Sequence, residues 1–179
     1  METELTTTIK RAIHTYNPKM GCLRTIRYAD EVTTPTGIVD SIRFEDIDVG
    51  TTTCKLKKEC PYPARKEKGC KGCIYRHHIT ETQMMVTCFE VKITMSDFHS
   101  GNGKNFCGNE NYYCIPKEMA SKVEEEIGRD SPIGILTWNG KGLRCYKPAR
   151  FIEIPELLIS QLLYNALKKW CDGVQKLDE

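Results

Sequence analysis

The chain has 179 residues, of which 40% are hydrophobic and 28% charged, with a formal net charge of +2. This composition is typical of one soluble globular domain, and no apolar run approaches the ~20 residues that a membrane-spanning helix needs, so we expect a single domain over residues 1–179 and no membrane partner. The N-terminal segment "METELTTTIKRAIH" lacks the apolar stretch of a secretory signal, which predicts a cytoplasmic protein in which disulfides are unusual.

The first part of the chain predicts one helix followed by two strands. Apolar side chains recur at helical spacing over residues 5–16, with threonines before them as caps and a proline shortly after them as the stop. Residues 23–32 and 38–47 have the pattern of strands around a turn at 33–37, and the second strand places Asp40 on one of its faces. A helix that leads into a β-hairpin is therefore expected.

A cysteine-rich segment follows at residues 50–83, and regular structure is expected to resume with a strand at 84–93. The segment has no usable periodicity. Between Cys54 and His78, six Lys and two Arg stand against two Glu, a local charge of +6. We expect an insertion within the single domain, and its basic character favours an anionic partner.

The remaining chain predicts alternating helices and strands. Ser96 is placed to cap a short helix, and a strand follows at 112–116. A helix over 119–127, a hairpin over 133–147 and a long amphipathic helix over 158–170 complete the pattern. The order of elements predicts an α/β domain with a mixed sheet flanked by helices.

The strand at 84–93 carries an acid and an amine on one face. Glu90 and Lys92 are two residues apart, roughly 6.5 to 7 Å at Cα, and so project together. If the strands form an antiparallel meander, Asp40 comes close to Glu90. Two carboxylates with a backbone carbonyl, here that of Val91, are the oxygen ligands that Mg²⁺ or Mn²⁺ prefers, and a neighbouring lysine can orient a metal-bound water.

This constellation predicts hydrolysis of phosphodiester bonds. The alternative is a solvent-facing salt pair between strands, since a Glu-x-Lys pattern by itself arises often by chance. The acid on the preceding strand and the apolar alternate face of the Glu90 strand favour a site, because burying an unpaired charge in a core is unfavourable.

The chain resembles the PD-(D/E)XK nuclease superfamily, and within it the MmcB-like branch associated with DNA repair, in the stretches "TGIVDSIRFEDI", "TCFEVKITMSDFHS", "NYYCIPKEM" and "PIGILTWNGKGLRCYKPA". The likeness covers most of residues 25–150 outside the insertion and implies a restriction-endonuclease-like core. By this resemblance Asp40 and Glu90 are metal ligands, Lys92 is the catalytic lysine, and Thr94 is a polar residue beside the site that contacts nucleic acid. The implied activity is that of a Mg²⁺-dependent deoxyribonuclease in DNA repair or in the processing of phage or mobile-element DNA.

Four cysteines of the insertion have the spacing C-x5-C-x9-C-x2-C, and the closing pair allows two thiolates to bind one tetrahedral ion. Zn²⁺ is the expected structural metal, with an iron–sulfur cluster or free cysteines as the alternatives. The fourth ligand is Cys54 or one of the histidines His77 and His78. Outside the insertion, Cys88 shares the Glu90 face, and Cys107 is expected only to pack. The candidate thiolate ligands are Cys54, Cys60, Cys70 and Cys73.

Lysines of the insertion predict contacts with DNA phosphates, whose strength falls as salt rises. A nuclease held on DNA by a zinc-binding insertion is thus the expected function, and a homodimer stays open. The alternative is a non-catalytic, zinc-stabilised nucleic-acid-binding module on a nuclease-like fold, an inactive relative of the nucleases. The candidate phosphate-binding lysines are Lys57, Lys58, Lys66 and Lys71.

Overall fold

The structure of the chain is a computed structural model that describes residues 3–16, 26–54, 76–101 and 103–175. Side chains are described over these ranges except at 48–54, 76–82 and 172–175. The chain divides into two compact units, one of Met1–Glu45 with Met85–Glu179 and the other of Asp46–Met84. The first unit holds every described helix, and the second consists, where it is described, of the continuation of two strands.

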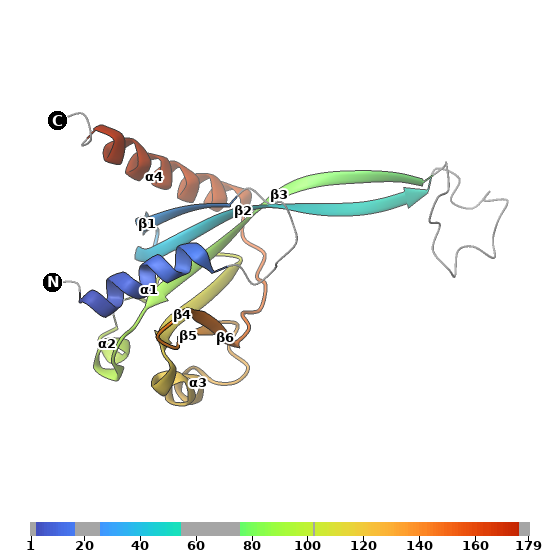
Figure 1. Ribbon diagram of the computed structural model, residues 1–179. Helices are drawn as coiled ribbons and strands as arrows, with labels where there is room; N and C mark the ends of the chain where they lie inside the picture. Colours follow the sequence, from blue (N-terminus) through green and yellow to red (C-terminus); the bar gives the residue numbers. More distant parts are fainter. Residues whose placement is uncertain (1–2, 17–25, 55–75, 102, 176–179) are drawn as a thin grey trace, which may run out of the picture. The chain divides into compact units, whose positions relative to one another are not determined.

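The strands form one six-stranded mixed sheet in the order β1-β2-β3-β4-β5-β6 (Figure 1). β1 pairs antiparallel with β2, β4 pairs parallel with both β3 and β5, and β6 pairs antiparallel with β5. The predicted mixed α/β sheet is therefore confirmed. The bounds are β1 (Ile26–Thr34), β2 (Gly37–Cys54), β3 (Arg76–Val91), β4 (Glu110–Pro116), β5 (Gly134–Trp138) and β6 (Leu143–Lys147).

Helices flank the sheet, and α4 runs beside β1 in Figure 1. The α4–β1 contact is fastened by Trp170, whose Nε1–H donates to Tyr28 O at 2.9 Å. No helix in the described part of the chain has the length and apolar character to cross a membrane. The bounds are α1 (Glu4–Thr15), α2 (Met95–His99), a 3-10 helix η3 (Lys117–Met119), α3 (Ala120–Ile127) and α4 (Glu156–Gln175).

The helix α1 covers one face of the sheet beside the predicted site. It begins at a cap, since Thr3 Oγ1 accepts from Thr6 N–H at 3.2 Å. One turn apart on its apolar side, Ile9 and Ile13 are fully buried in a cluster with Phe89 of β3. Burial of each such side chain contributes about 1.5–3 kcal/mol. The apolar alternate face of the Glu90 strand thus packs on this helix.

The opposite face of the sheet is covered by α2 and α3. Phe98 of α2 packs edge-on against Tyr113 of β4, with ring centroids 5.1 Å apart, and Phe106 contacts the same ring at 4.9 Å. This second cluster has a buried residue on each of α2, β4, η3, α3 and β5, and it completes a helix–sheet–helix arrangement. Its buried members are Phe98, Tyr113, Ile115, Met119, Ala120, Val123 and Ile135.

Two strands are longer than predicted. β2 continues to Cys54 and β3 begins at Arg76, so that residues 50–54 and 76–83, expected to be irregular, are strand. Three consecutive threonines end β2, and β-branched residues favour extended backbone even where a uniformly polar sequence offers no alternation to detect.

The start of α2 also differs from the prediction. Thr94, not Ser96, caps this helix, since Thr94 Oγ1 accepts from Asp97 N–H at 3.1 Å and the helix begins at Met95. Asp97 Oδ2 in turn accepts from Ile93 N–H at 3.3 Å. These two hydrogen bonds, one donated by Asp97 N–H and one by Ile93 N–H, hold the Asp97 side chain beside the end of β3.

Candidate active site

Asp40 of β2 and Glu90 of β3 meet in the folded chain. Val91 N–H donates to Asp40 Oδ2 at 2.8 Å, which fastens the Asp40 carboxylate to the residue after Glu90. The carboxyl of Glu90 is itself hydrogen-bonded to Asp40. The two acids that the sequence predicted to converge are therefore brought together.

Glu90 is buried, with only 2% of the residue exposed. Burial, and then the charge and hydrogen bond of Asp40, raise the pKa of Glu90 to about 8, although Lys92 and a backbone hydrogen bond from Asn105 act in the opposite direction. Its Oε1 atom has no hydrogen-bond partner among the described residues. At neutral pH the Glu90 carboxyl is mostly protonated and keeps one buried oxygen unused.

Lys92 borders the same acid pair and is also buried, with 5% exposed. Its Nζ donates to Asp97 Oδ1 at 3.4 Å. Gly103 lies against both side chains, because a Cβ added there would be 2.5 Å from Glu90 Oε2 and 2.8 Å from Lys92 Nζ. With a φ of +73° as well, position 103 requires glycine so that the backbone can approach the acid and the amine.

A second amine reaches Asp40 from α1. Lys10 Nζ lies 3.5 Å from Asp40 Oδ1 and 3.6 Å from Glu31 Oε1. The register of β1 and β2 places Glu31 across from Asp40. Glu31 has a φ of 54°, a left-handed conformation that is uncommon outside glycine. Backbone strain of this kind occurs often at functional sites.

These side chains line one cavity of about 660 Å³. A cavity of this volume is within the range of ligand-binding pockets. Three lysines and four acids supply its charge, so that with every group ionised the acids exceed the lysines by one. With Glu90 protonated, the charges of the lysines and acids balance, and ionisation of Glu90 makes the cavity attract a cation. The charged lining residues are Lys10, Glu31, Asp40, Glu90, Lys92, Asp97 and Lys169.

The acid pair fits a hard divalent cation. Asp40 and Glu90 offer carboxylate oxygens, one of them Glu90 Oε1, which no described residue hydrogen-bonds. Val91, whose carbonyl was predicted as a ligand, also lines the cavity. Within the described ranges, no three His, Cys, Asp or Glu side chains form a metal-binding group. Two carboxylates and a carbonyl are the smaller ligand set that Mg²⁺ accepts, since it retains several waters.

Among the other predicted site residues, only Thr94 can be placed. It is exposed, lines the cavity and caps α2. The predicted zinc ligands and phosphate-binding lysines of the insertion lie outside the described side chains. They are Cys54, Cys60, Cys70, Cys73, His77, His78, Lys57, Lys58, Lys66 and Lys71.

Sequence reasoning missed several residues that line the cavity, among them Lys10, Gly103 and Lys169. The two lysines lie on helices at opposite ends of the chain, and a solvent-facing lysine on an amphipathic helix has no distinguishing signal. Gly103 lies in the stretch "GNGKN", whose glycines indicated turns but not contact with an acid and an amine.

Comparison with known proteins leaves the function open. No protein-family model matches the chain, and no curated protein matches its sequence. Among solved structures, the chain is similar to a protein of unknown function from Silicibacter pomeroyi, at 13% sequence identity and a TM-score of 0.52 over 86% of this chain and 80% of that one. At this identity the likeness shows the fold alone.

Proposed function

We propose that this chain is a metal-dependent nuclease that hydrolyses phosphodiester bonds in DNA. The observation that carries the proposal is the pair of half-buried Asp40 and buried Glu90, which lines one cavity with Lys92 and leaves a Glu90 oxygen without a partner among the described residues. Two acids held close together, one of them buried, destabilise each other's charged form. Such a pair is typical of a site that gains a cation for its function.

The residues have separate roles in this proposal. Asp40, Glu90 and the carbonyl of Val91 would hold Mg²⁺ or Mn²⁺, which when bound supplies a Lewis acid for a phosphoryl oxygen and a lowered pKa for a water. Lys92 Nζ orients the attacking water and offsets charge that develops on the phosphate. Asp97 Oδ1 accepts from that amine and so keeps it beside the acids.

The net charge of the cavity is compatible with an anionic substrate once a divalent cation is bound. With all seven charged groups ionised, the cavity is negative by one charge, and a divalent cation would make it positive by one. Lys10 and Lys169, on opposite sides of the acids in the sequence, then contribute to a net positive charge that attracts phosphate. The layered mixed sheet is compatible with the restriction-endonuclease-like core that the sequence resemblance implies.

The insertion extends the proposal to DNA binding. Four cysteines at zinc-ligand spacing and a net charge of +6 between Cys54 and His78 support a zinc-stabilised basic segment that contacts DNA phosphates. Metal analysis of the purified protein tests this part, and we expect about one Zn²⁺ per chain, the stoichiometry of a four-thiolate site. Iron in place of zinc would indicate the cluster alternative.

A cleavage assay tests the catalytic proposal. Supercoiled plasmid, linear duplex and single-stranded oligonucleotides are incubated with the purified chain in Mg²⁺, Mn²⁺ or EDTA. We expect cleavage with either metal and none in EDTA. Asp40→Ala and Lys92→Ala should abolish cleavage, whereas Lys122→Ala, at an exposed position on α3, should cut as the parent does.

Circular dichroism shows whether the variants keep the parent fold. If folded Asp40→Ala and Lys92→Ala cut as well as the parent, the assignment of the site is wrong. Salt-sensitive DNA binding without cleavage in any divalent metal would instead support the non-catalytic binding module.

A further inference from the structure

Two thiols to which the sequence assigned no joint role are neighbours beside the candidate active site. Cys88 Sγ and Cys107 Sγ lie 3.8 Å apart. Cys88 is fully buried in β3, and Cys107 is half-buried in the segment between α2 and β4. Since a disulfide bond is about 2.05 Å long, the two sulfur atoms need to approach by less than about 2 Å to be joined.

The residues after Cys107 hold it in this position. Gly108 N–H donates to Asn111 Oδ1, and Asn111 Nδ2 donates back to Gly108 O, both at 2.9 Å. Val86 N–H of β3 donates to Asn109 Oδ1 at 2.9 Å. Because these bonds tie the segment to β3 and β4, Cys107 is held facing Cys88 and is not brought there by chance motion of a loop.

The residues before Cys107 lie on the candidate active site. Gly103 lies against Glu90 Oε2 and Lys92 Nζ. Asn105 forms a backbone hydrogen bond to Glu90, and its Nδ2 donates to Ile38 O of β2 at 2.9 Å. The thiol pair therefore stands at the end of a short backbone segment, residues 103–107, that covers the acid.

We propose that Cys88 and Cys107 are a redox pair that peroxide converts reversibly to a disulfide, which fastens residues 103–107 to β3. The sulfur of Cys107 attacks one oxygen of hydrogen peroxide, the O–O bond breaks, and a sulfenic acid and one water form. The sulfur of Cys88 then attacks the Cys107 sulfur, the S–O bond breaks, and the hydroxide leaves with the Cys88 proton as a second water. Both sulfurs are oxidised, and the peroxide is reduced.

The surroundings assign the attacking role to Cys107. It is the more exposed of the two, and hydrogen bonds with Cys88 and with Thr34 lower its pKa although burial opposes them. A thiolate is the reactive form of cysteine. Thiol pairs that oxidise transiently are the usual kind of disulfide in a reducing compartment, so the proposal agrees with a cytoplasmic location.

Peptide mapping tests the crosslink directly. The reduced full-length protein is treated with hydrogen peroxide, alkylated and digested with trypsin without reductant. We expect peptide 77–92, which contains Cys88, to be linked to peptide 105–117, and the link to disappear after reduction. Cys107→Ser should lose the link, and Cys114→Ala, which removes the other cysteine of peptide 105–117, should keep it.

The same samples show whether the proposal fails. If Cys88 and Cys107 remain alkylated as free thiols under conditions that oxidise the exposed Cys145, the redox pair is excluded. A linked peptide that persists in Cys107→Ser but is lost in Cys114→Ala would also overturn it.

Hydrogen exchange tests the effect on the segment without reference to catalysis. We expect amides of residues 103–107 to exchange more slowly in the oxidised parent than in the reduced parent, and no such change in Cys107→Ser. Equal exchange in both forms of the parent would contradict the fastening of this segment.

A consequence for catalysis rests on the proposed function. If residues 103–107 are fastened over Glu90, cleavage of DNA by the oxidised parent should be lost and should return on reduction, whereas Cys107→Ser should cut equally in both conditions. Absence of cleavage in the reduced parent counts against the nuclease and leaves the crosslink result as it stands. Full cleavage by a linked parent counts against the regulatory consequence alone.

Discussion

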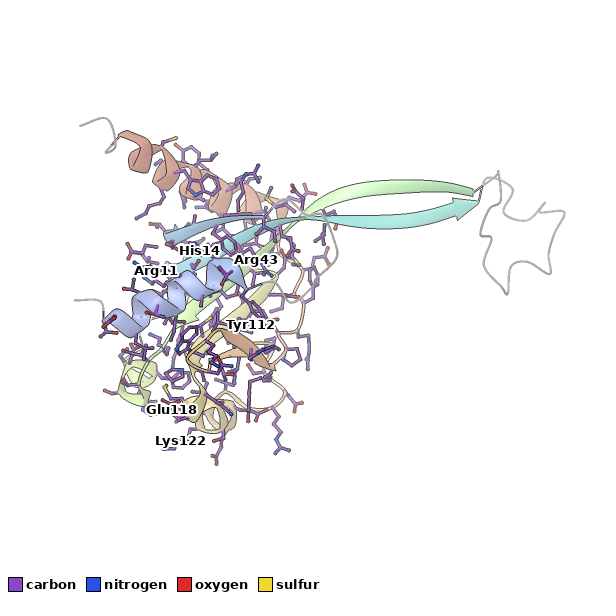
Figure 2. The ribbon with its side chains drawn as sticks, in the orientation of Figure 1. Arg11, His14, Arg43, Tyr112, Glu118 and Lys122 are labelled. Carbon is purple, nitrogen blue, oxygen red and sulfur yellow. The ribbon has the colours of Figure 1, made fainter. Side chains whose placement is uncertain are left out.

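Strands β2 and β3 carry two groups of buried or half-buried charged residues that differ in how their charges are balanced. Arg43 and Glu45 are each 3% exposed and form an ion pair at 3.4 Å. Arg43 also donates to Thr87 Oγ1 at 3.3 Å and to Tyr16 O at 3.4 Å, near the end of α1 (Figure 2). Arg43 Nε has no hydrogen-bond partner among the described residues. The opposite charges of Arg43 and Glu45 nevertheless balance each other, so this pair serves the fold.

The Asp40–Glu90 pair has the opposite character. Its two groups are of like charge, one oxygen has no partner in the described part of the chain, and both residues line the cavity. The comparison teaches that burial of charge alone does not identify a site on this sheet. What distinguishes the candidate site is buried charge that its neighbours leave unbalanced at an accessible cavity.

Two buried lysines repeat the contrast. Lys147 Nζ donates to three carbonyl oxygens, those of Gly128, Ser131 and Ile133, at 2.9 to 3.1 Å. Among the described residues, Lys92 Nζ has one long hydrogen bond, to Asp97 at 3.4 Å, and Lys92 lines the cavity. The first amine joins a loop to β6, and the second lies at the cavity.

The largest expected effect comes from breaking the balanced pair. Arg43→Met removes the guanidinium that pairs with the buried Glu45 carboxylate and donates to Thr87 Oγ1 and Tyr16 O, and it should lower the free energy of unfolding by about 3–5 kcal/mol. Glu90→Gln replaces a mostly protonated acid by an amide of similar shape and should change the free energy of unfolding by less than about 1 kcal/mol. Urea unfolding followed by circular dichroism measures the free energy of unfolding of both variants. Equal losses of stability would show that the two pairs do not differ in how their charges are balanced.

The lysines should separate stability from activity. Lys147→Met leaves three carbonyls without their donor and should lower the free energy of unfolding by about 3 kcal/mol, since each of the three hydrogen bonds contributes about 1 kcal/mol net. Lys92→Met should lower the free energy of unfolding by less, but it should remove Mg²⁺-dependent cleavage. Thermal unfolding measures the first effect and plasmid cleavage the second. A stable, inactive Lys147→Met would reverse the assignment of the two amines.

The pH dependence of stability reports on Glu90. Its pKa is about 8 in the folded chain and near 4.5 in the unfolded chain, so between these values the folded state binds more protons. Stability in EDTA should therefore fall as pH rises from about 5 to about 8, by up to about 1.4 kcal/mol per pH unit. Glu90→Gln should flatten this slope, and Glu45→Gln should not. Denaturation at several pH values measures the slopes, and an unchanged slope in Glu90→Gln would contradict the raised pKa.

The smallest effect concerns the strained backbone at Glu31. Glycine tolerates the φ of 54°, so Glu31→Gly should stabilise the chain by about 0.5–1 kcal/mol. Glu31→Gln removes the same exposed charge near Lys10 but keeps the strain, and it should give no gain. The difference in thermal unfolding between the two variants isolates the backbone contribution. A gain in Glu31→Gln as large as in Glu31→Gly would assign the effect to charge.

Much of the fold was predictable because its signals are local. The burial of Ile9 and Ile13 follows from helical spacing, the hairpin of β5 and β6 from an Asn-Gly turn, and the apolar side of β3 from alternation. Local signals failed at the end of β2 and the start of β3, where mostly polar residues are strand, and at the cap of α2, where threonine and serine compete within two residues. At the strand ends the local sequence does not separate strand from irregular backbone, and at α2 it does not separate the two candidate caps. Contacts with the rest of the fold therefore decide the outcome.

The sequence by itself determined that an acid and an amine share one face of β3, and it indicated that Asp40 would join them if the strands formed a meander. Only the tertiary structure decided that Lys10 reaches Asp40, that Gly103 covers Glu90, and that Cys88 and Cys107 are neighbours. The physical reason is that residues two apart on a strand have a relation set by backbone geometry. Contacts between remote segments depend on how helices and loops pack on the sheet, which no local pattern encodes.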